Sequence, residues 1–150
     1  MATKRDNVLT SELVDALVQL SFAVHQVLAR VSAEHNLSVT QLRLLGLLRD
    51  RTPPMTAIAE HLGLDRSSVT GLITRAEQRG LVVRTTSAHD ARVTVVSATP
   101  LAFDVGRQIA SKVTSEIEAL VADVPNAERD RMVRVVKVVL GRPSADDQVV

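Results

Sequence analysis

Apolar side chains recur with the 3.6-residue period of a helix in the first third of the chain. From about residue 10 to 34 they form one continuous stripe of leucine and valine. Ser38 and Gln41 then have the spacing of a capping box, and a leucine-rich helix is predicted from there to about Arg49. Because this helix is apolar on several sides, we expect it to be buried centrally. The first stripe consists of Leu13, Leu17, Leu20, Val24, Val27, Leu28 and Val31.

The last third of the chain shows the same helical period. Thr99 and Pro100 are suited to the N-cap and first turn of a long helix. A turn at 123–126 separates it from a final helix that carries valine on nearly every side. The segment 144–150 is predicted to be a frayed tail.

Two short amphipathic helices are predicted between these long ones, in residues 55–80. Thr56 is the expected cap of the first, and Gly63 supplies the left-handed position that ends it. Asp65 is a good N-cap for the second, and Gly80 ends it. The buried stripe of the second helix is Val69, Leu72, Ile73 and Ala76.

After Gly80 the pattern changes to β-branched runs at 81–86 and 92–97, which flank a polar tip at 87–91. This is typical of a hairpin with a longer loop. Asp90 and Arg92 lie two positions apart, so on a strand they would share a face and the carboxylate would orient the guanidinium. The alternative is a local surface ion pair worth ~0–1 kcal/mol.

Two helices joined by a glycine turn and followed by a hairpin form the pattern of a winged helix-turn-helix, which places one helix in the DNA major groove. The outer face of the helix after Asp65 is short-chained and hydroxyl-rich, and Gly71 costs about 1 kcal/mol relative to alanine there. Small residues let a helix approach DNA, although an ordinary surface helix with an accidental glycine remains the alternative. The predicted DNA-binding residues are Arg66, Ser67, Ser68, Thr70, Gly71, Thr74, Arg75, Arg84, Asp90 and Arg92.

These motifs resemble the multiple-antibiotic-resistance regulator (MarR) family of bacterial transcription factors. The resemblance rests on the helix-turn-helix at 56–80, on Gly80-Leu81-Val82-x-Arg84, and on Asp90-x-Arg92 with Thr99 closing the wing. It implies that Arg92 enters the minor groove, with Asp90 as its orienting partner. Leu101 stands where the family often has glycine. That departure concerns the start of a helix and leaves the DNA-binding interpretation intact.

Composition excludes several other classes of protein. The net charge is only +1, so any basic surface must be local. Cysteine is absent, which excludes disulfides and thiol-based sensing. No apolar run approaches the ~18 residues of a transmembrane helix, and a secretory h-region is missing, so we expect a cytoplasmic protein. No nucleophile elbow, phosphate loop or metal-ligand spacing is present, so we expect no enzyme activity, metal or cofactor.

The helices at about 10–34 and 100–141 carry more apolar surface than one DNA-binding unit covers. Their simplest use is a homodimer interface, which is also what the resemblance implies. Two-fold symmetry would then match a partly palindromic operator in double-stranded DNA.

The resemblance further implies a small aromatic or phenolic effector that binds between the dimerisation helices and the DNA-binding part. Phe22, His25, Arg43 and Phe103 are the candidate residues. The alternative is that the two phenylalanines are plain core and that Arg43 reaches solvent.

The sequence thus predicts a mainly α fold with a small β-hairpin wing, in one domain spanning 1–150, with the winged helix-turn-helix at about 38–99. The predicted function is that of a dimeric, sequence-specific, ligand-responsive repressor. Two alternatives remain: a small-molecule- or partner-binding module of this fold that has lost DNA binding, and an effector-independent DNA-binding protein.

Overall fold

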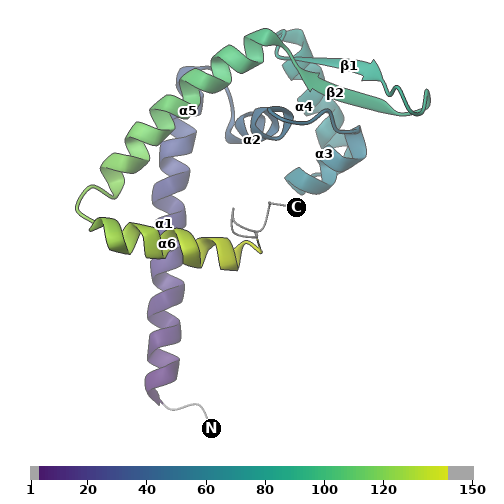
Figure 1. The fold of residues 1–150 in the computed structure, drawn as a ribbon. Helices are drawn as coiled ribbons and strands as arrows, with labels where there is room; N and C mark the ends of the chain where they lie inside the picture. The colour runs from purple at the N-terminus through teal and green to yellow at the C-terminus, as the bar shows by residue number, and fades with distance from the viewer. Residues whose placement is uncertain (1–3, 142–150) are drawn as a thin grey trace, which may run out of the picture. The chain divides into compact units, whose positions relative to one another are not determined.

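The computed structural model describes residues 4–141, so the predicted tail at 144–150 lies outside the described residues. The fold is mainly α with one two-stranded antiparallel hairpin, which confirms the predicted fold class (Figure 1). In chain order the elements are α1 (Lys4–Glu34), α2 (Val39–Leu48), α3 (Met55–Leu62), α4 (Arg66–Gln78), β1 (Val82–Thr86), β2 (Thr94–Ala98), α5 (Pro100–Leu120) and α6 (Asn126–Val139).

The chain divides into two compact units, residues 1–114 and 115–150, with the boundary inside α5. In the first unit α3 packs on both α2 and α4, and all three helices contact the base of the hairpin (Figure 1). The core lies among these elements, the C-terminal part of α1 and the first half of α5. Its largest fully buried apolar side chains are Leu44, Leu48, Ile58, Ile73, Ile109, Val31, Val69, Val82 and Val96.

Local capping explains most helix boundaries. Ser38 and Gln41 form the predicted capping box at the start of α2. Gly63 ends α3 in the left-handed conformation at φ 66°, and Gly80 adopts φ 69° after α4. The prediction that Thr56 caps α3 is wrong. The N-cap is Pro54, whose fixed φ suits an extended entry into the helix but which provides no side-chain cap.

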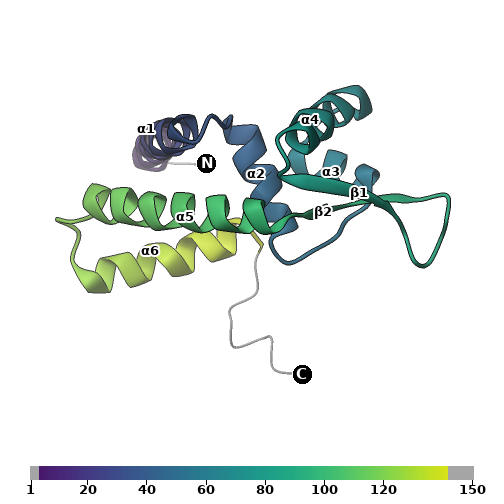
Figure 2. The same cartoon turned by 90° about the horizontal axis from the view of Figure 1, so that it is seen from above.

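The hairpin is held at its base and extends away from α3 and α4 (Figure 2). Val82 pairs with Ala98 at the base and Thr86 with Thr94 at the far end. Val96 N donates to Pro53 O at 3.0 Å, which ties β2 to the segment before α3. The second strand starts at position 94 rather than 92, because the residues before it form a turn.

Several large apolar side chains of α1 are exposed in the part of the chain that the structure describes. Leu13, Val14, Leu17 and Phe22 are all more than half exposed. By length and composition alone, Thr10–Glu34 qualifies as a helix that could cross a membrane, which contradicts the expectation that no segment would. A helix covered by other parts of a soluble protein meets the same criterion. The criterion therefore does not distinguish a bilayer from a protein partner.

Candidate nucleic-acid interface

Helix α4 begins with a polar cluster around Asp65. Ser68 N donates to Asp65 Oδ1 at 2.9 Å, and the Ser67 and Ser68 hydroxyls donate to the two carboxylate oxygens at 2.6 Å each. These hydrogen bonds, with that of the Ser67 hydroxyl the largest contributor, hold the pKa of Asp65 well below its usual value. Both serines, predicted to bind DNA, therefore use their hydroxyl protons in the N-cap of the free protein.

This cap predicts a pH-dependent contribution to stability. Because the pKa of Asp65 is lower in the folded than in the unfolded chain, the ionised carboxylate stabilises the fold above about pH 4 and does so less as pH falls. Asp65→Asn keeps a good N-cap without the charge. In urea unfolding at pH 7, 5 and 3, the stability advantage of the parent over this variant should shrink toward acid. An advantage that stays constant with pH would contradict the assignment.

The outward-facing threonines of α4 bond back onto the helix. Thr70 Oγ1 donates to Arg66 O and Thr74 Oγ1 donates to Thr70 O, both at 2.9 Å. Thr70 is exposed and Thr74 is half-buried. In the free protein Thr70 therefore offers an oxygen lone pair and a methyl group, rather than a hydroxyl proton, to a binding partner.

Gly71 makes room for the guanidinium of Arg75. A Cβ built on Gly71 would lie 3.2 Å from Arg75 Nη1, which is a tight contact. Both residues line a hollow of about 410 Å³ between α4 and the start of α2, together with Ser38, Thr40, Leu64, Ser67, Ser68 and Leu72. The structure thus brings together four of the predicted DNA-binding residues. The guanidinium of Arg75 in such a hollow suits a phosphate, whereas the hydroxyl protons of Ser67 and Ser68 are already donated to Asp65.

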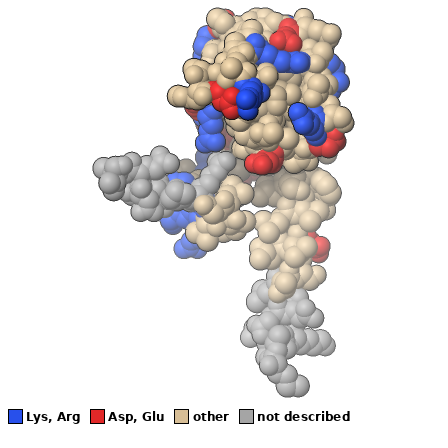
Figure 3. Space-filling view, turned by 90° about the vertical axis from the view of Figure 1, so that its right-hand side faces the viewer, with Lys and Arg blue, Asp and Glu red and all other residues tan. Residues whose placement is uncertain are grey.

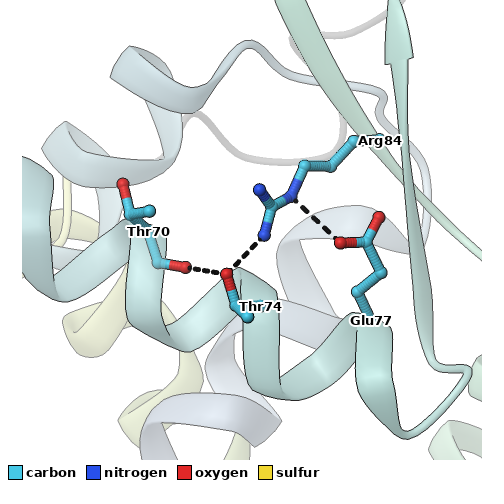
Figure 4. Close-up of polar contacts among 4 residues, drawn as sticks. All are labelled: Thr70, Thr74, Glu77 and Arg84. Carbon is cyan, nitrogen blue, oxygen red and sulfur yellow. Dashed lines mark hydrogen bonds and ion pairs between the residues drawn. The ribbon is translucent and has the colours of Figure 1, made fainter.

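Arg84 points from β1 to α4 and not away from the protein. Its Nη2 donates to Thr74 Oγ1 at 2.6 Å, and its Nε lies 3.4 Å from Glu77 Oε2 (Figure 4). The side chain of Arg84 is 29% exposed. Arg66 and Arg75, in contrast, are exposed.

The wing tip differs from the sequence prediction. Asp90 Oδ1 accepts a hydrogen bond from the backbone N of Arg92 at 2.9 Å, and Val93 N donates to Asp90 O at 3.0 Å. The described side chains show no ion pair between Asp90 and the Arg92 guanidinium. The reason is that these residues form a turn, in which two positions apart does not mean one shared face. Asp90 thus orders the turn, and the Arg92 side chain is exposed.

Positively and negatively charged side chains are interspersed on the surface of the predicted DNA-binding lobe, the winged helix-turn-helix at about 38–99. The face seen in Figure 3 carries lysine and arginine side chains interspersed with aspartate and glutamate, and no continuous basic surface covers it. This fits the net charge of +1. Contact with DNA would therefore depend on individually placed arginines more than on a general positive potential.

A second hollow, of about 370 Å³, lies among α1, α2, β2 and α5 within the first unit. Its lining is mostly apolar, with Arg49 and Arg107 as the charged members. Each arginine pairs with a neighbouring acid, Arg49 with Asp50 and Arg107 with Asp104. The lining residues are Leu28, Leu42, Leu45, Gly46, Arg49, Ala98, Ala102, Phe103, Gly106, Arg107, Ile109, Ala110 and Val113.

The four predicted effector residues do not gather in this hollow. Phe103 lines it, but Phe22 and His25 do not and are exposed on α1. Arg43 reaches the C-terminal end of α3, where its guanidinium donates to His61 O at 3.4 Å and Leu62 O at 3.5 Å. Helix periodicity does not reveal this contact, because it joins residues 18 and 19 positions apart.

Two glycines that line this apolar hollow, Gly46 and Gly106, are not singled out by the sequence pattern. A Cβ on Gly46 or Gly106 would meet no atom within 4 Å. Glycine inside a helix is destabilising relative to alanine, and here nothing in the surroundings requires its small size. An interior glycine on each of two amphipathic helices is a signal that could have pointed to this hollow.

Comparison with known proteins gives one family match and several structures of similar fold. Residues 35–93 match the model of the MarR family. Over these residues, the chain is similar to MarR-family proteins. The matched segment contains α2, α3, α4, β1 and the wing tip, and it ends just before β2. None of the curated proteins compared with the chain matches it.

Several solved structures share the fold over most of the chain. A MarR-family transcriptional regulator from Rhodococcus sp. RHA1 is 21% identical, with a TM-score of 0.75 over 87% of this chain and 94% of that one. CouR from Rhodococcus jostii RHA1, bound to p-coumaroyl-CoA, is 22% identical, with a TM-score of 0.73 over 87% and 93%. A variant of MepR from S. aureus, bound to an oligodeoxyribonucleotide, is 18% identical, with a TM-score of 0.63 over 86% and 96%.

Proposed function

We propose that this protein is a sequence-specific DNA-binding transcriptional regulator, a dimeric repressor of the MarR type that responds to a small molecule. The observation that carries the proposal is the combination of α4 with the wing. The exposed face of α4 offers Arg66, Thr70 and Arg75 around a glycine, and the hairpin beyond it carries the exposed Arg92. We propose that α4 is the recognition helix in the major groove and that the wing reaches the adjacent minor groove.

The exposed apolar faces of α1 and α6 support the proposed dimer. In the part of α6 that the structure describes, no residue is buried, and Val138 and Val139 are 80% and 75% exposed. Residues of α1 such as Leu13 and Leu17 are exposed to 59% and 55%. A second copy of the chain would cover both sets, and a two-fold dimer would present two recognition helices to a partly palindromic site.

The effector would occupy the apolar hollow beside Phe103. Its lining suits a planar, apolar molecule, and the two arginines suit an anionic group on it. The walls come from α1, α2, β2 and α5, so that a ligand there touches both a dimerisation helix and the base of the wing. CouR, whose structure holds p-coumaroyl-CoA, is a precedent for a ligand in this fold. We also propose that the protein is cytoplasmic and has no enzyme activity, metal or cofactor.

The two glycines of the hollow provide the test of the effector site. Gly106→Ala should raise stability by about 0.5–1 kcal/mol, since alanine favours the helix and its Cβ meets open space. Gly106→Leu should fill the hollow and abolish the thermal shift that a panel of phenolic acids produces in the parent. Gly106→Ala serves as the matched control and should retain that shift, and both variants should still bind DNA. A thermal shift that survives Gly106→Leu unchanged would place the ligand elsewhere.

The alternatives make different predictions about DNA. A binding module that had lost DNA binding would not enrich any sequence, and an effector-independent protein would enrich one but ignore all ligands. Selection of bound sequences from a random duplex library decides between them. The proposal predicts a partly palindromic winner whose half-sites lie about 10 base pairs apart. Failure to enrich any sequence would overturn it.

A further inference from the structure

We propose that Arg84 is a positioning residue that fixes the wing against the recognition helix α4, and that it does not bind a DNA phosphate. This inference rests on the proposed DNA-binding function. The position of Arg84 at the base of the hairpin would by itself suggest a contact with a DNA phosphate. We replace that role with a structural one inside the protein.

Strand alternation places Arg84 on the inner face of the hairpin. Val82 is buried, Val83 is exposed, and Arg84 is again partly covered, which is the period-two pattern of a strand packed on one side. The covered face of β1 packs on α4. Arg84 therefore continues the buried face of Val82 and meets the recognition helix.

Two side chains of α4 hold the guanidinium there. Thr74 and Glu77 lie three residues apart on one face of the helix, and Arg84 reaches both (Figure 4). Thr74 accepts from Arg84 with one lone pair while its own hydroxyl donates to Thr70 O, so the hydroxyl is used in both directions. The Nε of Arg84 is shielded from solvent and makes no hydrogen bond among the described residues, and its contact with Glu77 Oε2 at 3.4 Å is an ion pair. The charge of the guanidinium is thus compensated inside the lobe.

The consequence concerns the distance between two DNA contacts. Helix α4 and the wing tip would enter different grooves, so their separation must match the duplex. Arg84 pairs across the ladder with Val96 of β2, the strand that leads back from the tip. Loosening Arg84 would let the hairpin move relative to α4. Affinity would then fall although no phosphate contact is lost.

Salt dependence separates the two roles. A phosphate contact releases counterions, so its removal lowers the log-affinity versus log-salt slope by about 1 per subunit. A positioning residue releases none. Arg84→Met should weaken binding to the selected operator about 10-fold with an unchanged slope, whereas the matched control Arg92→Met should weaken binding and also lower the slope. A slope that falls by about 1 per subunit in Arg84→Met overturns the proposal.

A mutant cycle tests whether Arg84 acts through Glu77. If the two groups work as a pair, Glu77→Gln should change operator affinity by different factors in the parent and in the Arg84→Met background. Thr74→Val keeps the shape of threonine but removes the acceptor for Arg84, so it should weaken operator binding. Thr74→Ser keeps the hydroxyl and should bind the operator as the parent does. Equal effects of Glu77→Gln in both backgrounds would contradict the pairing.

The contact can also be measured without DNA. In ¹⁵N NMR of the free protein, the Arg84 Nε–H signal should exchange with water more slowly than that of the exposed Arg92, and it should move in Glu77→Gln. If the parent binds no duplex, the proposed function fails, and this spectrum alone decides whether the arginine is held. An Arg84 signal that exchanges as fast as that of Arg92 overturns the inference.

Discussion

Arg92→Ala should lower affinity for the selected operator by about 10-fold or more at ~150 mM salt, while the fold and the dimer stay intact. Arg92 is exposed in the tip turn, where it contributes nothing to the core. The narrow minor groove of A·T-rich DNA concentrates negative potential, and an inserted guanidinium gains from it. Operator titration by fluorescence anisotropy measures the loss. The slope of log affinity against log salt should flatten by up to about 1 per subunit.

Two controls separate the wing from general charge. Arg131→Ala removes an exposed arginine of α6, outside the proposed DNA-binding lobe, and should leave operator affinity nearly unchanged. Asp90→Ala removes the side chain that orders the tip turn, and it should cost less affinity than Arg92→Ala with almost no change in slope. If Arg92→Ala binds the operator as tightly as the parent, the wing does not contact DNA.

Val139→Asp should convert the dimer into monomers of 16.2 kDa and abolish operator binding. Val139 is 75% exposed in the single chain, and we infer that a second copy covers it. An unpaired carboxylate buried at that interface costs several kcal/mol, and two-fold symmetry introduces it twice. We expect dimer dissociation to rise by at least ~100-fold. Analytical ultracentrifugation at micromolar concentration measures the change.

The matched control for this variant is Asn126→Asp, which introduces the same single negative charge at an exposed polar position of α6. It should leave the dimer intact. Circular dichroism of Val139→Asp distinguishes dissociation from unfolding. A parent that sediments only as a 16.2 kDa species would contradict the dimer itself.

The sequence predicted the helices well because their signals are local. The Ser38–Gln41 capping box, the Asp65 cap and the left-handed Gly63 each act within one turn of helix, so that the pattern alone specifies them. The failed cap at Thr56 has the same origin. Pro54 starts α3 through its backbone and leaves no side-chain signature in the sequence.

The site was less predictable because its contacts join distant parts of the chain. Arg43 donates to the end of α3, and Arg79, the C-cap residue after α4, donates to the carbonyls of His35 and Asn36 after α1. No periodicity encodes such pairs. For Arg84, however, the alternation of β1 was visible in the sequence and already placed it on the same face as Val82.

The polarity of individual side chains was also a poor guide to whether they are free to bind DNA. Ser67, Ser68 and Arg84 are polar and lie where DNA is expected, but each has partners inside the protein. Arg92 and Arg75 are exposed. The difference depends on three-dimensional neighbours, which a single sequence does not contain.

A competition titration at ~150 mM salt tests most directly whether α4 and the wing read a specific DNA sequence. A labelled duplex carrying the selected site is displaced by unlabelled duplexes that contain either the same site or its scrambled sequence. We expect the scrambled duplex to compete at least ~10³-fold less well, with one dimer bound per site. Equal competition by the two duplexes would contradict sequence-specific recognition.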